Sequence, residues 1–147
     1  MPVAERRDYI ERTMRVAYAE LKNTIDEKVI SYSHHWNACK AQITAALSEA
    51  FGIDCTGLFN DLRCNLSLNP IEPRFLKEHC YDTFYLNSAK GAIGDGIHEI
   101  IHFIWFYVWN RLFGDNYDEY ERPSLKWILS EMVVESVMRD ERLSSIN

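Results

Sequence analysis

The sequence predicts a single α+β domain that is mostly helical, and three observations support this prediction. Apolar residues recur every three or four positions over long stretches in both halves of the chain, as they do on one face of a helix. A short central stretch alternates apolar with polar residues, as a half-exposed strand does. The 147 residues are the length of one domain, which we divide into N-terminal helices over 1–52 and a core over 53–147.

Residues 3–51 are predicted to form two helices. One apolar stripe runs from Ile10 to Val29 at helical spacing, and a second follows Ser33, which we expect to cap a new helix after a break at residues 31–35. Gly52 ends this second helix. We expect the two helices to form an antiparallel hairpin. Because the first stripe is long and continuous, we also expect it to pack against the core.

Two short strands are predicted in the middle of the chain. The stretch from Leu62 to Leu68 alternates apolar with polar residues, and Pro70 ends it because proline cannot donate to a sheet ladder. The stretch from Thr83 to Leu86 is the second candidate strand.

Two helices follow the strands. The first begins between residues 88 and 94 and ends at Gly114. It is apolar on nearly every side from Ile97 to Trp109, so it should lie in the middle of the protein. The last helix runs from Pro123, which suits a first turn, to about Leu143.

Charge and cysteine content exclude several classes of protein. The net charge of −6, with no basic cluster longer than Arg6-Arg7, disfavours binding to nucleic acid or to an anionic membrane. The N-terminus lacks the apolar core of a secretory signal, and the longest apolar run is too short to span a membrane. The four cysteines form no CxxC pair, so we interpret them as reduced thiols of a cytoplasmic protein.

The residues that suggest chemistry are His98-Glu99-Ile100-Ile101-His102, an HExxH sequence on the apolar helix. Histidines four positions apart project from one helix face, so both imidazoles can converge on one metal ion. Glu99 is displaced around the helix and can reach a water molecule on that ion, which is the position of the general base in a zinc hydrolase. The simpler interpretation is a pair of core histidines hydrogen-bonded to the backbone, with Glu99 at the surface.

A third ligand is expected on the last helix. The extended pattern HExxHxxGxxH is absent, because other residues stand at its glycine and third histidine. Glu131 and Glu135 lie about 40° apart on a helical wheel, within a mainly apolar arc, where a carboxylate needs a partner such as a metal ion. The alternative is that both carboxylates pair with Arg139 or Arg142.

HExxH followed by ExxxE on the next helix resembles the gluzincin metallopeptidases, whose pattern is HExxH, a glutamate ligand and an acidic residue four positions later. The resemblance implies that His98, His102 and Glu131 bind Zn²⁺. It also implies that Glu99 acts as base and acid and that Glu135 supports a histidine ligand; glutamate in place of aspartate at Glu135 is a mild departure. The small size resembles the single-domain minigluzincins, which implies a zincin-like core with a short sheet, an active-site helix and a ligand helix.

The function that the resemblance implies is zinc-dependent hydrolysis of peptide bonds. Glu99 would accept a proton from a metal-bound water as that water attacks the carbonyl, and return it to the leaving amine. The partner would be a peptide or protein substrate, added as a strand at an exposed sheet edge, either 62–68 or 83–86. Four residues are candidates for stabilising the oxyanion: Tyr85, Tyr117, Tyr120 and His79.

Two other functions stay open. A catalytically silent or latent metal-binding protein would share the fold and the ligands but act through interactions, with the N-terminal helices as a cover or a docking surface. A di-iron carboxylate bundle is suggested by Glu99 and His102, which form an ExxH sequence. That architecture requires a second ExxH, and the chain has none.

Overall fold

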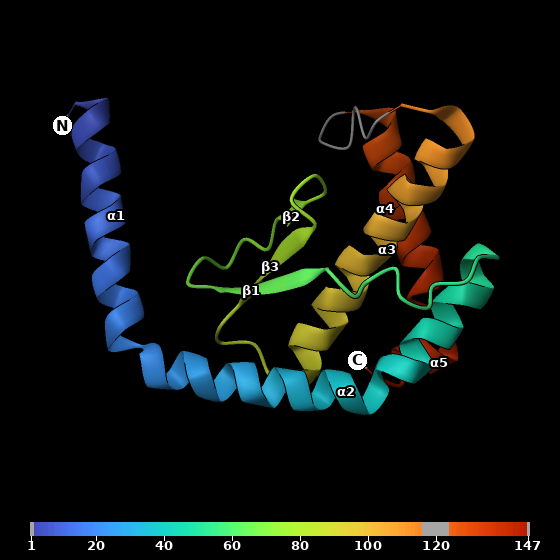
Figure 1. Cartoon of the computed structure of the whole chain (residues 1–147), viewed down its shortest axis with the longest axis horizontal. Coiled ribbons are helices and arrows are strands. Elements are labelled where there is room, and N and C mark those ends of the chain that lie inside the picture. Colours follow the sequence, from blue (N-terminus) through green and yellow to red (C-terminus); the bar gives the residue numbers. More distant parts are fainter. Residues whose placement is uncertain (1, 116–123, 147) are drawn as a thin grey trace.

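The computed structural model describes residues 2–115 and 124–146 as a mostly helical α+β fold with one small sheet, as the sequence predicts (Figure 1). In chain order the elements are α1 (Val3–Glu20), α2 (Lys22–Phe51), β1 (Arg63–Ser67), β2 (Arg74–Phe75), β3 (Cys80–Phe84), α3 (Ala89–Phe113), α4 (Leu125–Val137) and α5 (Glu141–Ser144).

The two N-terminal helices do not form the predicted hairpin. They meet at Leu21, and Figure 1 shows α1 turning away from α2 at a steep angle instead of folding back along it. The predicted break at residues 31–35 is also wrong, because α2 continues through it and Ser33 caps no helix. This segment contains no glycine or proline, and the Tyr32 hydroxyl donates to the carbonyl of Asn87 at 2.7 Å. The residues of this segment are weak helix formers, so the absence of a helix breaker and the contact with the rest of the fold keep it helical.

Most of α1 is exposed, so the expectation that its apolar stripe packs against the core is wrong. The Ile10 side chain is 59% exposed, and α1 reaches the sheet through the Tyr18 hydroxyl, which donates to the carbonyl of Leu66 at 3.2 Å. The core is covered instead by the C-terminal half of α2, where Ile43 and Leu47 are buried against α3. An apolar stripe indicates that a helix face needs a partner, but it does not say which partner.

Removal of residues 1–20 is expected to leave the rest of the chain folded, with a melting temperature within about 3 °C of the full-length value. The reason is that α1 buries little surface. Removal of residues 1–33, which also removes the hydrogen bond from Tyr32 to Asn87, should lower the melting temperature further. Thermal unfolding followed by circular dichroism compares the three proteins. Precipitation of the shorter deletion would show that α1 is part of the core.

The sheet has the strand order β1-β3-β2, with β3 in the centre. β1 runs parallel to β3, with Cys64 opposite Tyr81, and β2 runs antiparallel to β3, with Arg74 opposite Tyr81. The strand predicted over 62–68 is confirmed as β1, whereas the second strand begins three residues earlier than predicted, at Cys80. A central strand is buried on both faces and shows no alternation, and the two residues of β2 are too few to show any.

α3 runs through the middle of the fold within the predicted bounds. At its start the Ser88 hydroxyl accepts the Gly91 amide at 3.0 Å, and at its end Gly114 adopts a left-handed conformation with φ of 69°. Most residues from Ala92 to Phe106 are buried. The HExxH sequence therefore lies in the interior of the protein.

The last predicted helix is divided in two. Ser124 caps α4, which ends at Val137, and Asp140 caps the short α5. The Asp140 carboxylate accepts the backbone amide of Arg142 at 2.9 Å, a local bond that competes with continuation of α4. The predicted start at Pro123 lies outside the described residues.

The sheet and α3 approach closely at Gly96. A Cβ atom at Gly96 would lie 2.7 Å from the hydroxyl oxygen of Tyr81, a separation that real Cβ contacts do not show. Tyr81 is only 6% exposed, so its hydroxyl has little room to move away. The glycine therefore allows a β3 side chain to rest on the α3 backbone, two residues before His98.

Gly96→Ala is expected to lower the free energy of unfolding by about 1 kcal/mol or more, despite the roughly 1 kcal/mol that alanine gains as a helix former. Tyr81→Phe removes the clashing oxygen and leaves the ring carbon Cζ at 3.4 Å from the new methyl group. The double variant should therefore recover much of the loss. Urea unfolding of the wild type, the two single variants and the double variant measures how far the two substitutions depend on each other. If the losses of unfolding free energy in the two single variants simply add in the double variant, the Tyr81 hydroxyl is not what excludes a methyl group at position 96.

Two carboxylates share the side-chain amide of Asn87. Its nitrogen lies 2.8 Å from Oε1 of Glu72 and 2.8 Å from Oδ2 of Asp95. Burial and the neighbouring charge of Glu72 raise the pKa of Asp95 to about 6. A carboxyl whose pKa is higher in the folded chain than in the unfolded chain favours folding when protonated. Its contribution to stability is therefore lost as the pH rises from about 4 to 6.

Asp95→Asn removes this ionisation. The melting temperature of the variant, relative to wild type, is expected to rise steadily between pH 4 and pH 7, because only the wild type then acquires a partly buried charge next to Glu72. Glu78→Gln, at an exposed position, is the control and should show no such trend. Thermal melts across the pH range make the measurement. A constant difference between Asp95→Asn and wild type would contradict a raised pKa.

Two further features are the state of the cysteines and the apolar length of the helices. All four cysteines are free, and Cys55 and Cys80 are buried. In the part of the chain that the structure describes, no helix is both long enough and apolar enough to pass through a membrane.

Candidate metal centre

Two histidines of α3 face the same point. His98 and His102 are one turn apart on α3, so they share a helix face. Their Nε2 atoms lie 3.1 Å apart and their ring centroids 4.9 Å apart. The His102 side chain is fully buried, whereas 40% of the His98 side chain is exposed. The pair is therefore accessible to solvent at the His98 end.

α4 brings a carboxylate to this pair. α4 packs against α3, as Figure 1 shows, and its residues Ser130 and Val134 are buried. Glu131 lies between them in the sequence and reaches both histidines. Its Oε1 is 3.4 Å from Nε2 of His102, and its Oε2 is 3.7 Å from Nε2 of His98.

The spacing of these donor atoms fits a tetrahedral metal ion. Ligand atoms at about 2.0–2.1 Å from a tetrahedral zinc ion are about 3.3–3.4 Å from one another. The two nitrogens are 3.1 Å apart, and each lies 3.4 or 3.7 Å from a different oxygen of Glu131, so all three distances are close to that value. Imidazole nitrogens and a carboxylate oxygen are also donor types that zinc accepts. The residues present therefore fit an ion of this kind.

A second carboxylate, that of Glu99, lies close to the same nitrogens. One donor atom each from His98, Glu99 and His102 lie within 4.8 Å of one another, so these residues alone could hold an ion. Oε1 of Glu99 is 3.8 Å from Nε2 of His98, and its Oε2 is 3.6 Å from Nη1 of Arg74. Glu131 approaches both histidines, whereas Glu99 approaches one and is also held by an arginine. Either carboxylate is therefore near enough to the histidines to complete a site.

Glu99 is buried, with 7% of its surface exposed. Burial raises the pKa of Glu99 to about 7, while the positive charge of Arg74 lowers it and the negative charge of Glu131 raises it further. A carboxyl with such a pKa can exchange a proton near neutral pH, as a general base does.

Both histidines favour their neutral form. Burial lowers the pKa of His102 far below the ordinary value, and the charges of Arg74 and His98 act in the same direction. Burial also lowers the pKa of His98, although the charge of Glu131 opposes this. Neutral imidazole is the form that binds a metal ion. Within the described residues, the buried Nδ1 of His102 has no hydrogen-bond partner.

Glu135 does not take the predicted supporting position. Its carboxylate accepts from the Arg139 guanidinium at 2.6 Å, and 71% of its side chain is exposed. The angle between Glu131 and Glu135 on the helical wheel is small, but four residues displace them by about 6 Å along the helix axis. The local pair with Arg139, which the sequence left open as the alternative, is the one that forms.

Arg74 is the residue of the site that the sequence did not reveal. It lies on β2, and 11% of its side chain is exposed, so its charge is held close to Glu99 inside the fold. The two-residue strand carries no periodic signal, and a single arginine between a proline and a phenylalanine is unremarkable in a sequence. The contact between β2 and α3 depends on the tertiary fold alone.

None of the hydrogen bonds, ion pairs or ring contacts of the described residues brings one of the four candidates for stabilising an oxyanion to the two histidines. Tyr117 and Tyr120 lie outside the described residues. His79 pairs with Asp61 at 3.0 Å and packs edge-on against Phe103. Tyr85 packs against the ring of Phe84.

Comparisons of the chain with protein-family models, with curated proteins and with solved structures found no match. The resemblance to gluzincins therefore rests on the HExxH and ExxxE sequences and on the approach of Glu131, but not of Glu135, to the two histidines.

Proposed function

We propose that the chain is a zinc-dependent hydrolase of peptide bonds, in which His98, His102 and Glu131 hold the metal and Glu99 is the general base. The observation that carries the proposal is the convergence of two imidazole nitrogens with the carboxylate of Glu131 beside the buried carboxylate of Glu99. When bound, the zinc ion supplies a more acidic water molecule and polarises the carbonyl group under attack.

Glu99 moves the proton in this proposal. Its carboxylate accepts a proton from the attacking water as the new carbon–oxygen bond forms, and it donates that proton to the leaving amine as the carbon–nitrogen bond breaks. Arg74 contacts Oε2 of Glu99, which leaves Oε1 on the side of His98. The arginine thus orients the base without blocking it.

The substrate we propose is a peptide in extended form, added at the free edge of β2. The earlier candidate at 83–86 is wrong as an edge, because β3 lies in the centre of the sheet. Both β1 and β2 are edge strands, but β2 carries Arg74, which contacts Glu99. A substrate paired with β2 would place its carbonyl groups near the base.

A catalytically silent metal-binding protein of the same fold is the second candidate. The exposed end of His98 and the partly exposed Glu131 side chain, at 40% and 32%, favour the hydrolase, because a substrate needs this access. The free cysteines suit the reducing cytoplasm that we propose as its compartment.

Metal analysis and peptide cleavage test the proposal together. Elemental analysis of the purified protein should find about one zinc ion per chain, as expected for a single site with three protein ligands. Mass spectrometry of a mixed peptide library should show cleavage that a chelator stops and added zinc restores. Zinc without cleavage of any peptide would support the silent metal-binding protein, and absence of bound metal would refute both candidates.

A further inference from the structure

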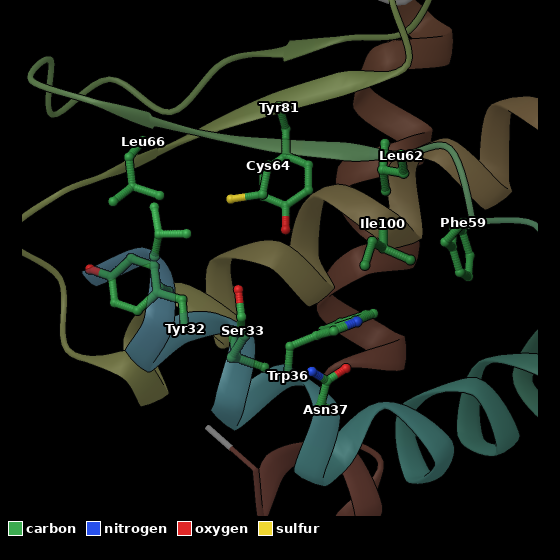
Figure 2. Close-up of a pocket in the computed structure, with 13 residues that line it drawn as sticks. Tyr32, Ser33, Trp36, Asn37, Phe59, Leu62, Cys64, Leu66, Tyr81 and Ile100 are labelled. Carbon is green, nitrogen blue, oxygen red and sulfur yellow. The ribbon is translucent and has the colours of Figure 1, made fainter. Parts of the chain in front are cut away.

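A cavity of about 290 Å³ lies between α2, the sheet and α3 (Figure 2). Its walls come from α2, from the loop before β1, from β1 and β3, and from one face of α3. Ser33 and Asn37 of its wall are exposed, so the cavity opens to solvent on one side. Its volume is close to the lower end of the range for small-molecule sites, so it is large enough to hold a small ligand.

The cavity lies on the opposite side of α3 from the histidines. Ile93 and Ile100 of α3 face the cavity. At 100° per residue they are about 140–180° around the helix from His98 and His102. The cavity is thus separate from the candidate metal centre, and binding at the two places can be tested independently.

The lining of the cavity is apolar and aromatic, with hydrogen-bonding groups on two sides. Tyr32 and Trp36 of α2 contribute aromatic rings. Figure 2 shows the hydroxyls of Tyr81 and Ser33 pointing into the space between the sheet and α2. Asn37 adds a side-chain amide from the next turn of α2. A mainly apolar pocket with a few polar groups is typical of small-molecule sites.

The residues described as lining the cavity are uncharged, which disfavours a charged ligand. Burial and the charges of Asp82 and Glu72 raise the pKa of the Cys64 thiol to about 11, against a hydrogen bond from Tyr81 that lowers it. Burial, Cys64 and more distant carboxylates, including Asp95, also raise the pKa of the Tyr81 hydroxyl. Burial is the main cause of both shifts, so this wall is poorly hydrated, and a charged ligand would lose its hydration there.

We propose that this cavity binds a small neutral molecule, mainly apolar and one or two rings in size, whose single hydroxyl or amide group hydrogen-bonds with Tyr81, Ser33 or Asn37. The size follows from the volume, because an apolar cavity of about 150 Å³ accommodates benzene and this one has about twice that space. The neutrality follows from the uncharged and poorly hydrated lining.

Naphthalen-2-ylmethanol is a suitable probe, because it has two rings and one hydroxyl. Isothermal titration of the full chain should show saturable binding of one probe per chain. Ser33→Phe places a ring in the cavity from an exposed position and should weaken binding at least tenfold. Ser31→Phe is the matched control, since Ser31 is equally exposed on α2 but does not line the cavity. Binding to this control and to His98→Ala should equal binding to wild type.

The anion 2-naphthoate tests the expected charge, and it should bind at least tenfold more weakly than the alcohol. Asn37→Phe is a second variant that fills the cavity from an exposed position, and it should behave like Ser33→Phe. Absence of saturable binding by the alcohol would overturn the proposal. Equal binding of alcohol and anion, or unchanged binding in both filled variants, would overturn it as well.

Discussion

Glu99→Gln is expected to reduce the rate of peptide hydrolysis by at least about a hundredfold, the usual contribution of a general base. Glutamine keeps the size and the hydrogen-bonding capacity of the side chain but does not accept a proton at neutral pH. In the proposed site Glu131 is the third ligand and approaches both histidines, so the variant should keep its zinc. Initial rates on a peptide that the wild type cleaves, with zinc content measured in parallel, make the comparison.

The matched control is Glu135→Gln. Glu135 is exposed on α4 and pairs with Arg139, so its loss of charge should leave both the rate and the zinc content unchanged. Equal rates for wild type and Glu99→Gln would remove Glu99 as the base. Loss of zinc together with activity would instead identify Glu99 as a ligand, in line with its position within 4.8 Å of the two histidines.

Glu131→Ala is expected to weaken zinc binding by more than about a hundredfold. Residues that only hydrogen-bond to a metal ligand contribute about 10–100-fold to metal affinity, and a ligand itself should contribute more. Zinc at about 100 times its dissociation constant stabilises a folded protein by about 2.7 kcal/mol. For a chain of this length that corresponds to a rise of about 5–10 °C in melting temperature. The wild type should show this rise on addition of zinc, and Glu131→Ala should not.

Glu135→Ala serves as the control here too and should respond to zinc as the wild type does. Melting curves with and without zinc, and titration of zinc against a chromophoric chelator, measure the two effects. Full retention of zinc by Glu131→Ala would mean that α4 supplies no ligand and that the ion is held by α3 alone.

The parts of the site that the sequence predicted are those set by local geometry. The spacing of His98 and His102 fixes their common face on any helix, and the apolar surroundings of Glu131 indicated a buried partner. The end of α3 followed from Gly114, whose capping role depends on immediate neighbours, and its start at Ala89 lies within the predicted range of 88–94.

The parts that the sequence missed depend on tertiary contacts. Arg74 belongs to a strand of two residues that exists only because β3 pairs with it. The hairpin was wrong because the stripe on α1 does not specify what it packs against, and Ile10 is exposed. Glu135 was misplaced because a helical wheel shows the angle around the axis but not the distance along it.

The three proposed ligands are divided between α3 and α4, and this division affects how the chain would unfold. A metal ion shared by His102 on α3 and Glu131 on α4 would act as a removable cross-link. It would close a loop of about 30 residues, and a covalent link of that span reduces the entropy of the unfolded chain by an amount worth about 3–4 kcal/mol. The same ion would tie α4 to the centre of the fold, so metal supply would govern the lifetime of the folded chain as well as its chemistry.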